Sequence, residues 1–217
     1  NAPAPAPPIP GEPLIGKGML ESKTTTTTEG KTKETVAMGK DAAAQVAAAK
    51  KAGEKSIAIK LDDSQADSTE VIVSKEVLQN AAGMGIQIIT PNVTLELPET
   101  LVRELGNEEL SILVEQGDAG SCIKKMQDTG LSATIVGTPT QIHSEIKGST
   151  RVVLPLDGVN LPVDQAQRDN FLAGLAIFAS HSDGTKEVLQ AKVVYDTGGN
   201  PAGVAFTTER FSTFAII

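Results

Sequence analysis

The sequence predicts an α+β protein in which a duplicated αββ unit is followed by a mostly antiparallel β-sandwich. Three observations lead to this fold class. Hydrophobic residues make up 40% of the 217 residues and charged residues 21%, an ordinary balance for a chain with one or two cores. Helix-like and strand-like segments alternate up to residue 118, and short alternating strands follow. All six aromatic side chains lie in the last 47 residues, which indicates that the two parts are built differently.

The first 13 residues read NAPAPAPPIPGEP and hold six of the twelve prolines. Proline lacks an N–H donor and restricts the residue before it, so this segment cannot form a helix and favours extended polyproline II. We interpret residues 1–20 as a Pro/Ala-rich linker between domains of a longer protein. A disordered tail is the alternative.

Five consecutive threonines, residues 24–28, follow the linker. Threonine is β-branched and favours strands, and the neighbouring lysines discourage association between sheet edges. We therefore expect an exposed edge strand or hairpin, with a second linker as the alternative. The next segment predicts a helix from Asp41, as N-cap, to Gly53, because alanine dominates its interior and lysines occupy its last turn.

The helix-and-strand pattern then runs to residue 118, and part of it repeats. Residues 71–78 match residues 95–102 at an offset of 24, and in each copy a strand leads into a helix that begins after Ser74 or Pro98. The repeat predicts a duplicated αββ domain over residues 21–118. Its predicted strands are 56–61, 71–73, 86–89, 93–97 and 110–115, and its later helices are 75–82 and 99–105.

Residues 119–217 are expected to form the β-sandwich domain. Short alternating segments recur with turn residues between them. The last strand is apolar on both faces, which predicts a central position in the sheet and not a frayed end. The expected strands are 133–136, 141–146, 151–156, 172–179, 188–195, 204–207 and 213–217.

The last 34 residues carry a resemblance to a known family. They contain Asp183-Gly-Thr, then AKVVYD at 191–196, VAFTT at 204–208 and FSTFAII at 211–217. This ending, with the upstream αββ duplication, is similar to modules of Gram-positive cell-surface proteins that often lie next to S-layer homology domains. The resemblance covers roughly residues 36–217. It implies an extracellular, surface-attached protein with a structural or spacer role and no catalytic residues.

The ending also resembles that of ZU5-type sandwich domains, some of which cut their own backbone at a His-Phe-Ser triplet. Here the triplet is Arg210-Phe211-Ser212. Arginine cannot act as a general base near neutral pH, so the sequence argues against self-cleavage at Ser212.

Other candidate chemistry is sparse, and the sequence assigns no catalytic, cofactor-binding or metal-binding residue. Cys122, His143 and His181 could form a nucleophile pair, but their surroundings fit a strand, a turn and a small buried thiol better. A calcium site at the turn that holds Asp62, Asp63, Asp67 and Glu70 lacks EF-hand spacing. Asp196 with Asn200 is typical of a hairpin turn, and residues 117–120 lack the lysine and hydroxyl of a phosphate loop.

Charge and hydropathy limit the classes of partner that the protein is expected to bind. The net charge of −8 disfavours nucleic acid, and the longest clean apolar run is too short to insert into a membrane. We therefore expect a non-catalytic spacer or assembly module whose partners are neighbouring domains of a surface protein. A protein- or cell-wall-binding module is the first alternative, and a self-processing surface domain is the second.

Overall fold

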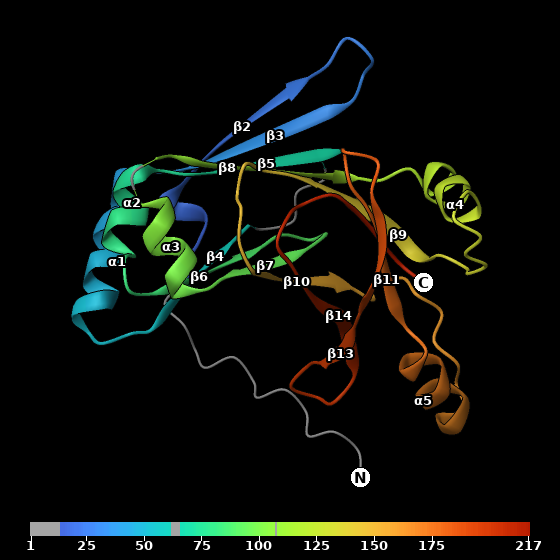
Figure 1. Cartoon of the computed structure of the whole chain (residues 1–217). Helices are drawn as coiled ribbons and strands as arrows, with labels where there is room; N and C mark the ends of the chain where they lie inside the picture. Colours follow the sequence, from blue (N-terminus) through green and yellow to red (C-terminus); the bar gives the residue numbers. More distant parts are fainter. Residues whose placement is uncertain (1–13, 62–65, 107) are drawn as a thin grey trace.

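The computed structural model describes residues 14–61, 66–106 and 108–217. These residues form an α+β protein that is mostly sheet (Figure 1). The helices are η1 (Lys17–Met19), α1 (Lys40–Lys51), α2 (Lys75–Asn80), α3 (Glu99–Leu105), α4 (Ala119–Gln127) and α5 (Gln165–Ala173).

The strands form two mixed sheets, named A and B here. Sheet A has the order β1 (Leu14–Ile15), β4 (Ser56–Lys60), β6 (Gly85–Ile89), β7 (Thr94–Leu97), β10 (Thr150–Pro155), β14 (Pro201–Thr208) and β13 (Lys192–Tyr195). Sheet B has the order β12 (Lys186–Gln190), β11 (Ala176–Ser180), β15 (Thr213–Ile216), β9 (Val136–His143), β8 (Leu110–Gln116), β5 (Ser68–Val73), β3 (Thr32–Met38) and β2 (Leu20–Thr26).

Strands from both predicted domains share both sheets. In sheet A, β7 pairs with β10, and in sheet B, β8 pairs with β9. The predicted boundary at residues 118 and 119 therefore lies between strands that belong to one continuous sheet. The parallel pairs, β1–β4, β4–β6 and β3–β5, are all contributed by residues before 118. Described pairs between the later strands are antiparallel.

Helices α1, α2 and α3 gather at one end of the molecule (Figure 1). Each leads the chain from one sheet to the other: α1 and α2 run from sheet B to sheet A, and α3 runs from A to B. The two copies of the sequence repeat consequently take unlike places, because β5 lies in sheet B and β7 lies in sheet A. Buried side chains of both sheets and of these helices join one hydrophobic core.

Short links connect the sheets at both pairs of edges. The edge strands β1 of sheet A and β2 of sheet B are joined by residues 16–19, and the opposite edge strands β12 and β13 are joined by Ala191 alone. Ile15, in β1, is fully buried. The predicted linker over residues 1–20 thus extends into folded structure from residue 14, while its first 13 residues lie outside the described part of the chain.

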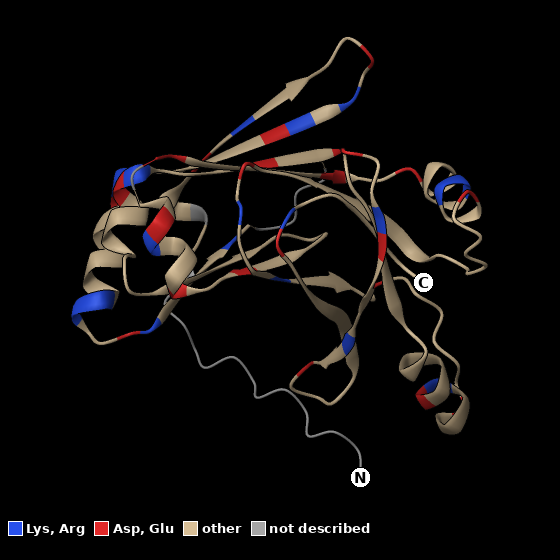
Figure 2. Cartoon of the chain, in the orientation of Figure 1, with Lys and Arg blue, Asp and Glu red and all other residues tan. Residues whose placement is uncertain are grey.

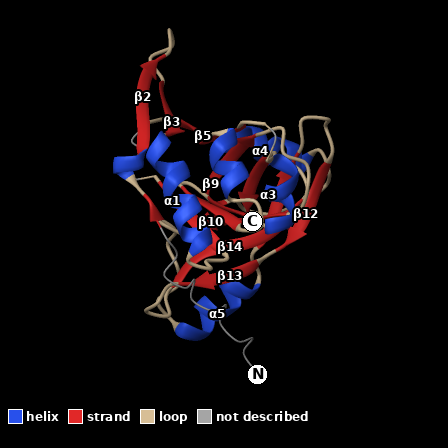
Figure 3. Ribbon diagram, turned by 90° about the vertical axis from the view of Figure 1, so that its left-hand side faces the viewer, coloured by secondary structure: helices blue, strands red, loops and turns tan. Residues whose placement is uncertain are grey.

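Several element predictions are confirmed and several are wrong. Gly53 takes the left-handed conformation at the end of α1 (φ 88°), and the Ser74 side chain caps α2. Helix α1 begins one residue before Asp41, however, and its N-cap is Gly39. The first three of the five threonines lie in β2 and the last two in the turn that follows it, and the hairpin of β2 with β3 projects beyond the body of the molecule in two views (Figures 1 and 3).

The second part contains two helices where no helix was predicted. Helix α4 is capped by Asp118, whose carboxylate accepts the backbone N–H of Ser121. Helix α5 is capped by Asp164, whose carboxylate accepts the backbone N–H of Gln167. The strand predicted over residues 172–179 is therefore the end of α5 followed by β11. The strand predicted over 188–195 is divided between β12 and β13, which lie in different sheets. Residues 133–135 are irregular, and β9 ends at His143 and not at Ile146.

Candidate functional site

Ser212 lies in the crossover between β14 and β15, which carries the chain from sheet A to sheet B. Its surroundings follow from strand register: Ser180 at the end of β11 pairs with Thr213 at the start of β15. In an antiparallel ladder the next residue of one strand lies opposite the preceding residue of the other. The register thus places His181 directly opposite Ser212, although the two are 31 residues apart in sequence.

The three side chains of Ser212, His181 and Glu187 form a hydrogen-bonded relay. Ser212 Oγ contacts His181 Nδ1, and His181 Nε2 lies 2.7 Å from Glu187 Oε1. Ser212 Oγ also lies 2.6 Å from the carbonyl oxygen of Phe211, the residue before it. A hydroxyl, an imidazole and a carboxylate in this order are the parts of a nucleophile, a general base and the group that orients the base.

The relay is nearly closed to solvent at its inner end. Ser212 is 7% exposed and His181 is 5% exposed, whereas the Glu187 side chain is 45% exposed. A buried imidazole costs free energy unless both ring nitrogens have partners. Here both nitrogens have one, so the cluster also satisfies the purely structural requirement of a buried histidine.

A second set of contacts holds the turn between β11 and β12 against the crossover. The guanidinium of Arg210 donates to Asp183 Oδ2 at 2.7 Å and to Thr185 Oγ1 at 2.9 Å. The hydroxyl and backbone N–H of Thr185 and the Arg210 guanidinium lower the pKa of Asp183 to about 2. Gly184 has φ 86°, a left-handed conformation that glycine tolerates best, and it lets this turn close. Arg210 therefore binds the loop that carries His181.

The structure separates the other predicted candidates. Cys122 is buried in α4, and burial raises the pKa of its thiol, which disfavours the nucleophilic thiolate. His143 contacts Glu115 at 3.0 Å on an exposed part of sheet B and contacts Gln141 as well. The cysteine and the two histidines therefore do not assemble into one site.

The acidic residues of the predicted calcium turn have other partners. Asp67 accepts hydrogen bonds from the backbone and hydroxyl of Thr32, which lower the pKa of Asp67. Glu70 pairs with Lys33 at 2.9 Å and accepts from Ser111, and these contacts lower the pKa of Glu70. Asp62 and Asp63 lie outside the described residues. In the described part of the chain, no cluster of three or more potential metal ligands occurs.

Asp196 and Asn200 close a hairpin turn, as the sequence indicates. The backbone N–H of Asn200 donates to Asp196 Oδ1 at 2.8 Å, and Gly199 has φ 80°. The Asn200 bonds lower the pKa of Asp196.

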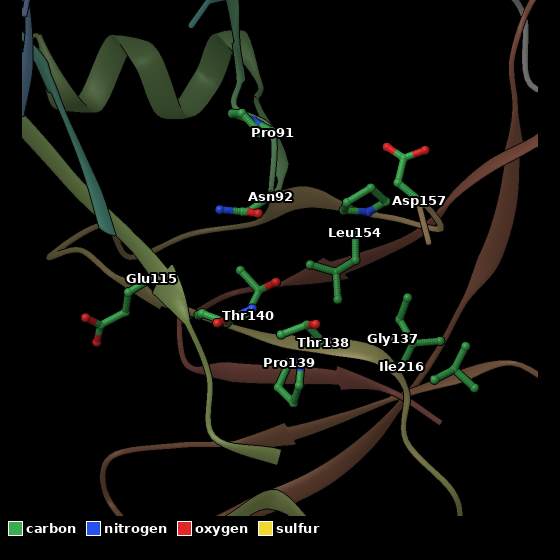
Figure 4. Close-up of a pocket in the computed structure, with 13 residues that line it drawn as sticks. Pro91, Asn92, Glu115, Gly137, Thr138, Pro139, Thr140, Leu154, Asp157 and Ile216 are labelled. Atoms are coloured by element: carbon green, nitrogen blue, oxygen red, sulfur yellow. The ribbon is translucent and has the colours of Figure 1, made fainter. Parts of the chain in front are cut away.

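An open pocket lies between the two sheets, beside the turn that joins β6 to β7 (Figure 4). Residues 136–140 of β9 form one side, and Leu154, Pro155 and Asp157 form another. Its two carboxylates, Glu115 and Asp157, lie on opposite sides in Figure 4, so they do not form an acid–base pair across it. The pocket therefore presents no reactive group comparable with the Ser212 relay.

No described helix is long and apolar enough to cross a membrane. Comparison with known proteins finds no matching family model, no matching curated protein and no matching solved structure.

The relay was the part of the site that sequence reasoning missed. Ser212 and His181 were both recognised as candidates, but as members of different groups. Only the pairing of β11 with β15 relates them, and no local signal in the sequence specifies that register.

Proposed function

We propose that this chain is a non-catalytic structural module, a spacer or an assembly unit, of a bacterial surface protein located outside the cell. Its partners are the neighbouring domains of that protein. The observation that carries the proposal is the shared construction of the two sheets. Strands from both parts of the chain pair in sheet A and in sheet B, and buried side chains of both sheets form one hydrophobic core. Because the two parts of the chain share both sheets and one core, the module should move as one rigid body without an internal hinge.

Two finer structural assignments belong to this proposal. The first is that the αββ units arose by duplication, which is supported by the shared order of strand and helix in β5–α2 and β7–α3. The second is that the later part is a β-sandwich, which is supported by the antiparallel pairing of its strands.

The charge distribution supports a structural role more than a role in binding polyanions. Lys and Arg are interspersed with Asp and Glu over the ribbon and do not gather on one element (Figure 2). A chain with net charge −8 and no basic stripe repels phosphate backbones.

The spacer role is tested by replacement in the parent surface protein. Deleting the module should shorten the reach of the protein from the cell surface, and an unrelated rigid domain of similar length should restore it. Reach is measured as the distance between labelled ends on intact cells. A deletion that changes neither reach nor surface display contradicts the proposal.

A binding module is the second candidate, and the β2–β3 hairpin is the observation that favours it. The hairpin projects from the body, and β2 is the outermost described strand of sheet B, with a described neighbour on one side only (Figure 1). Extended peptides bind such edges by adding a strand. If an unrelated domain restores reach but not adhesion, and a hairpin deletion also abolishes adhesion, the binding role replaces the spacer role.

A further inference from the structure

The backbone hydrogen bonds of β2 show which of its residues point away from β3. The N–H of Thr27 donates to the carbonyl oxygen of Lys31 at 2.7 Å, and the N–H of Gly39 donates to that of Met19 at 3.0 Å. Both pairs continue the unbroken register of β2 with β3. Residues that bond to the partner strand alternate with residues that do not. The odd-numbered residues of β2 therefore bond to β3.

The even-numbered residues of β2, from Leu20 to Thr26, direct their backbone N–H and C=O groups away from β3. In the described part of the chain, no strand lies on that side of β2. Every residue of β2 after Leu20 is exposed, and the hairpin projects from the body (Figures 1 and 3). Such an edge is a template to which another extended strand can add.

Glu21 and Lys23 carry opposite charges on one face of this edge strand, because residues two apart on a strand point to the same side. In the described part of the chain, neither side chain forms an ion pair, whereas Lys33 of the neighbouring strand is paired with Glu70. The strand that adds to β2 should therefore carry the two charges in the opposite order.

We propose that this strand is β2 of a second copy of the chain, in an antiparallel pair centred on Ser22. An antiparallel copy of a strand presents the same residues in reverse order. Ser22 then faces Ser22 of the second copy, and Leu20 faces Thr24 of the second copy. All of these residues direct their backbone groups outward, so the contact contains about six backbone hydrogen bonds.

The charges select this register from its neighbours. Centred on Ser22, the pair places Glu21 of each copy opposite Lys23 of the other, in a non-hydrogen-bonded pair where side chains lie closest. A pair centred on Lys23 places lysine opposite lysine, and a pair centred on Glu21 places glutamate opposite glutamate. A pair centred on Thr24 places both charges opposite threonines. Lysine ordinarily protects an edge strand from pairing, and this protection is offset only in the register centred on Ser22.

The contact is two-fold symmetric and therefore closed: each copy uses the same edge, and a third copy finds no β2 edge left. It involves one short strand from each copy, so the dimer is weak and exchanges rapidly. The dimer does not rest on the proposed spacer role, because it is a property of the isolated chain. The reach experiment and the experiment below can consequently fail independently.

Sedimentation equilibrium of the full chain tests the dimer, over concentrations up to about 1 mM, where a small contact is populated. We expect the average mass to rise with concentration from 22.5 kDa toward twice that value and no further. High salt should weaken the dimer, because the paired charges are exposed. A wild-type chain that stays at 22.5 kDa throughout overturns the proposal.

A charge exchange tests the register. Glu21→Lys and Lys23→Glu should each raise the dissociation constant by about tenfold or more, because each converts two opposite-charge pairs into like-charge pairs. An equimolar mixture of the two variants should dimerise as the wild type does, because both pairs are again of opposite charge. The double variant, Glu21→Lys with Lys23→Glu, should also recover the wild-type dissociation constant.

Lys192→Glu is the matched control, since it makes the same charge change at an exposed position of β13, an edge strand of sheet A. It should leave the dissociation constant unchanged, and all variants should keep the wild-type melting temperature because the changed side chains are exposed. A dimer that is weakened by Lys192→Glu and not by Lys23→Glu would place the contact elsewhere and overturn the proposal. Single variants that dimerise as the wild type does would also overturn it.

Discussion

Asp183 is a single exposed carboxylate whose hydrogen bonds set a clear pH dependence. Its pKa is lowered from 3.8 to about 2, first by Thr185 and then by Arg210. A lowered pKa in the folded state stabilises the fold above the unfolded pKa, and this contribution is lost as the pH falls through the folded pKa. We expect Asp183→Asn to lower the melting temperature at pH 7 and the difference from wild type to close as the pH falls from about 4 toward about 2.

The effect of Asp183→Asn should be small and should weaken in high salt, because the ion pair with Arg210 is exposed. Thermal melts of both proteins at several pH values measure it. A difference that persists unchanged at pH 2 would contradict the assigned cause.

Gly203 is a position in β14 where no larger residue fits. A Cβ added here would lie 2.8 Å from the carbonyl oxygen of Leu154 and 2.8 Å from a methyl carbon of Val153. The first is backbone of the paired strand β10 and cannot move aside cheaply. Gly203→Ala should therefore destabilise the protein by about 1–3 kcal/mol. Gly18→Ala is the control, because an added Cβ there meets nothing within 4 Å.

Denaturant unfolding gives both values. Equal free energies of unfolding for the two glycine variants would contradict the close packing of β14 against β10 at Gly203.

Local signals were readable from the sequence where a residue acts on its immediate neighbours. Gly53 at the end of α1 and Ser74 at the start of α2 are of this kind. The contact between His181 and Ser212 was not readable, because it depends on which strands become neighbours. The sequence singled out Ser212 and His181, but neither Glu187 nor the arrangement of the three residues.

Strand β15 is an element whose position the sequence indicated correctly. It lies between β11 and β9, and Phe214 is fully buried with its ring 4.9 Å from that of Phe206. Phe214→Ala should cost about 3–5 kcal/mol, and deletion of residues 211–217 should abolish cooperative folding, since domains have about 5–15 kcal/mol in total. Val163→Ala, at a side chain that is 96% exposed, should change stability by less than about 0.5 kcal/mol.

Circular dichroism during thermal unfolding reports both changes. A deletion variant that keeps the wild-type transition would show that β15 contributes little to the core.

Helices α4 and α5 were missed because each is short and has few apolar residues at helical spacing. Helix α4 buries Cys122 and Met126, four residues apart on one face, after the cap Asp118. That pattern could have been found, although Gly120 in the first turn lowers the helix propensity of the segment. Helix α5 buries Leu172 alone, so its apolar residues gave no helical period, and Leu172 was assigned to the following strand.

The whole molecule should unfold in one step. Strands before and after residue 118 pair in both sheets, through β7–β10 and β8–β9, so neither part has a complete sheet by itself. We expect a single calorimetric transition for the full chain and no folded structure for residues 119–217 expressed alone. Two separate transitions, or a folded fragment, would instead support two independent domains.

The topology at this scale could not be derived from residue patterns. The sequence places strands in order along the chain, but it does not specify which strands become neighbours in a sheet. Residue 191 alone separates β12 from β13, yet the chain changes sheet there. A pattern of alternating residues continues across such a corner, which is why 188–195 was predicted as one strand.

Short segments of the chain join sheet A to sheet B at both pairs of edge strands. Residues 16–19 close one side and Ala191 closes the other. Two packed sheets that are linked at one side only can separate first at the opposite side. A covalent link at each side hinders the described parts of the two sheets from separating at either pair of edges, so opening is expected to begin with a strand that leaves its sheet. The amides of β12 and β13 that donate to β11 and β14 should therefore exchange their hydrogens only when a strand leaves its sheet, whereas the outward-facing amides of these edge strands exchange as fast as those of exposed loops.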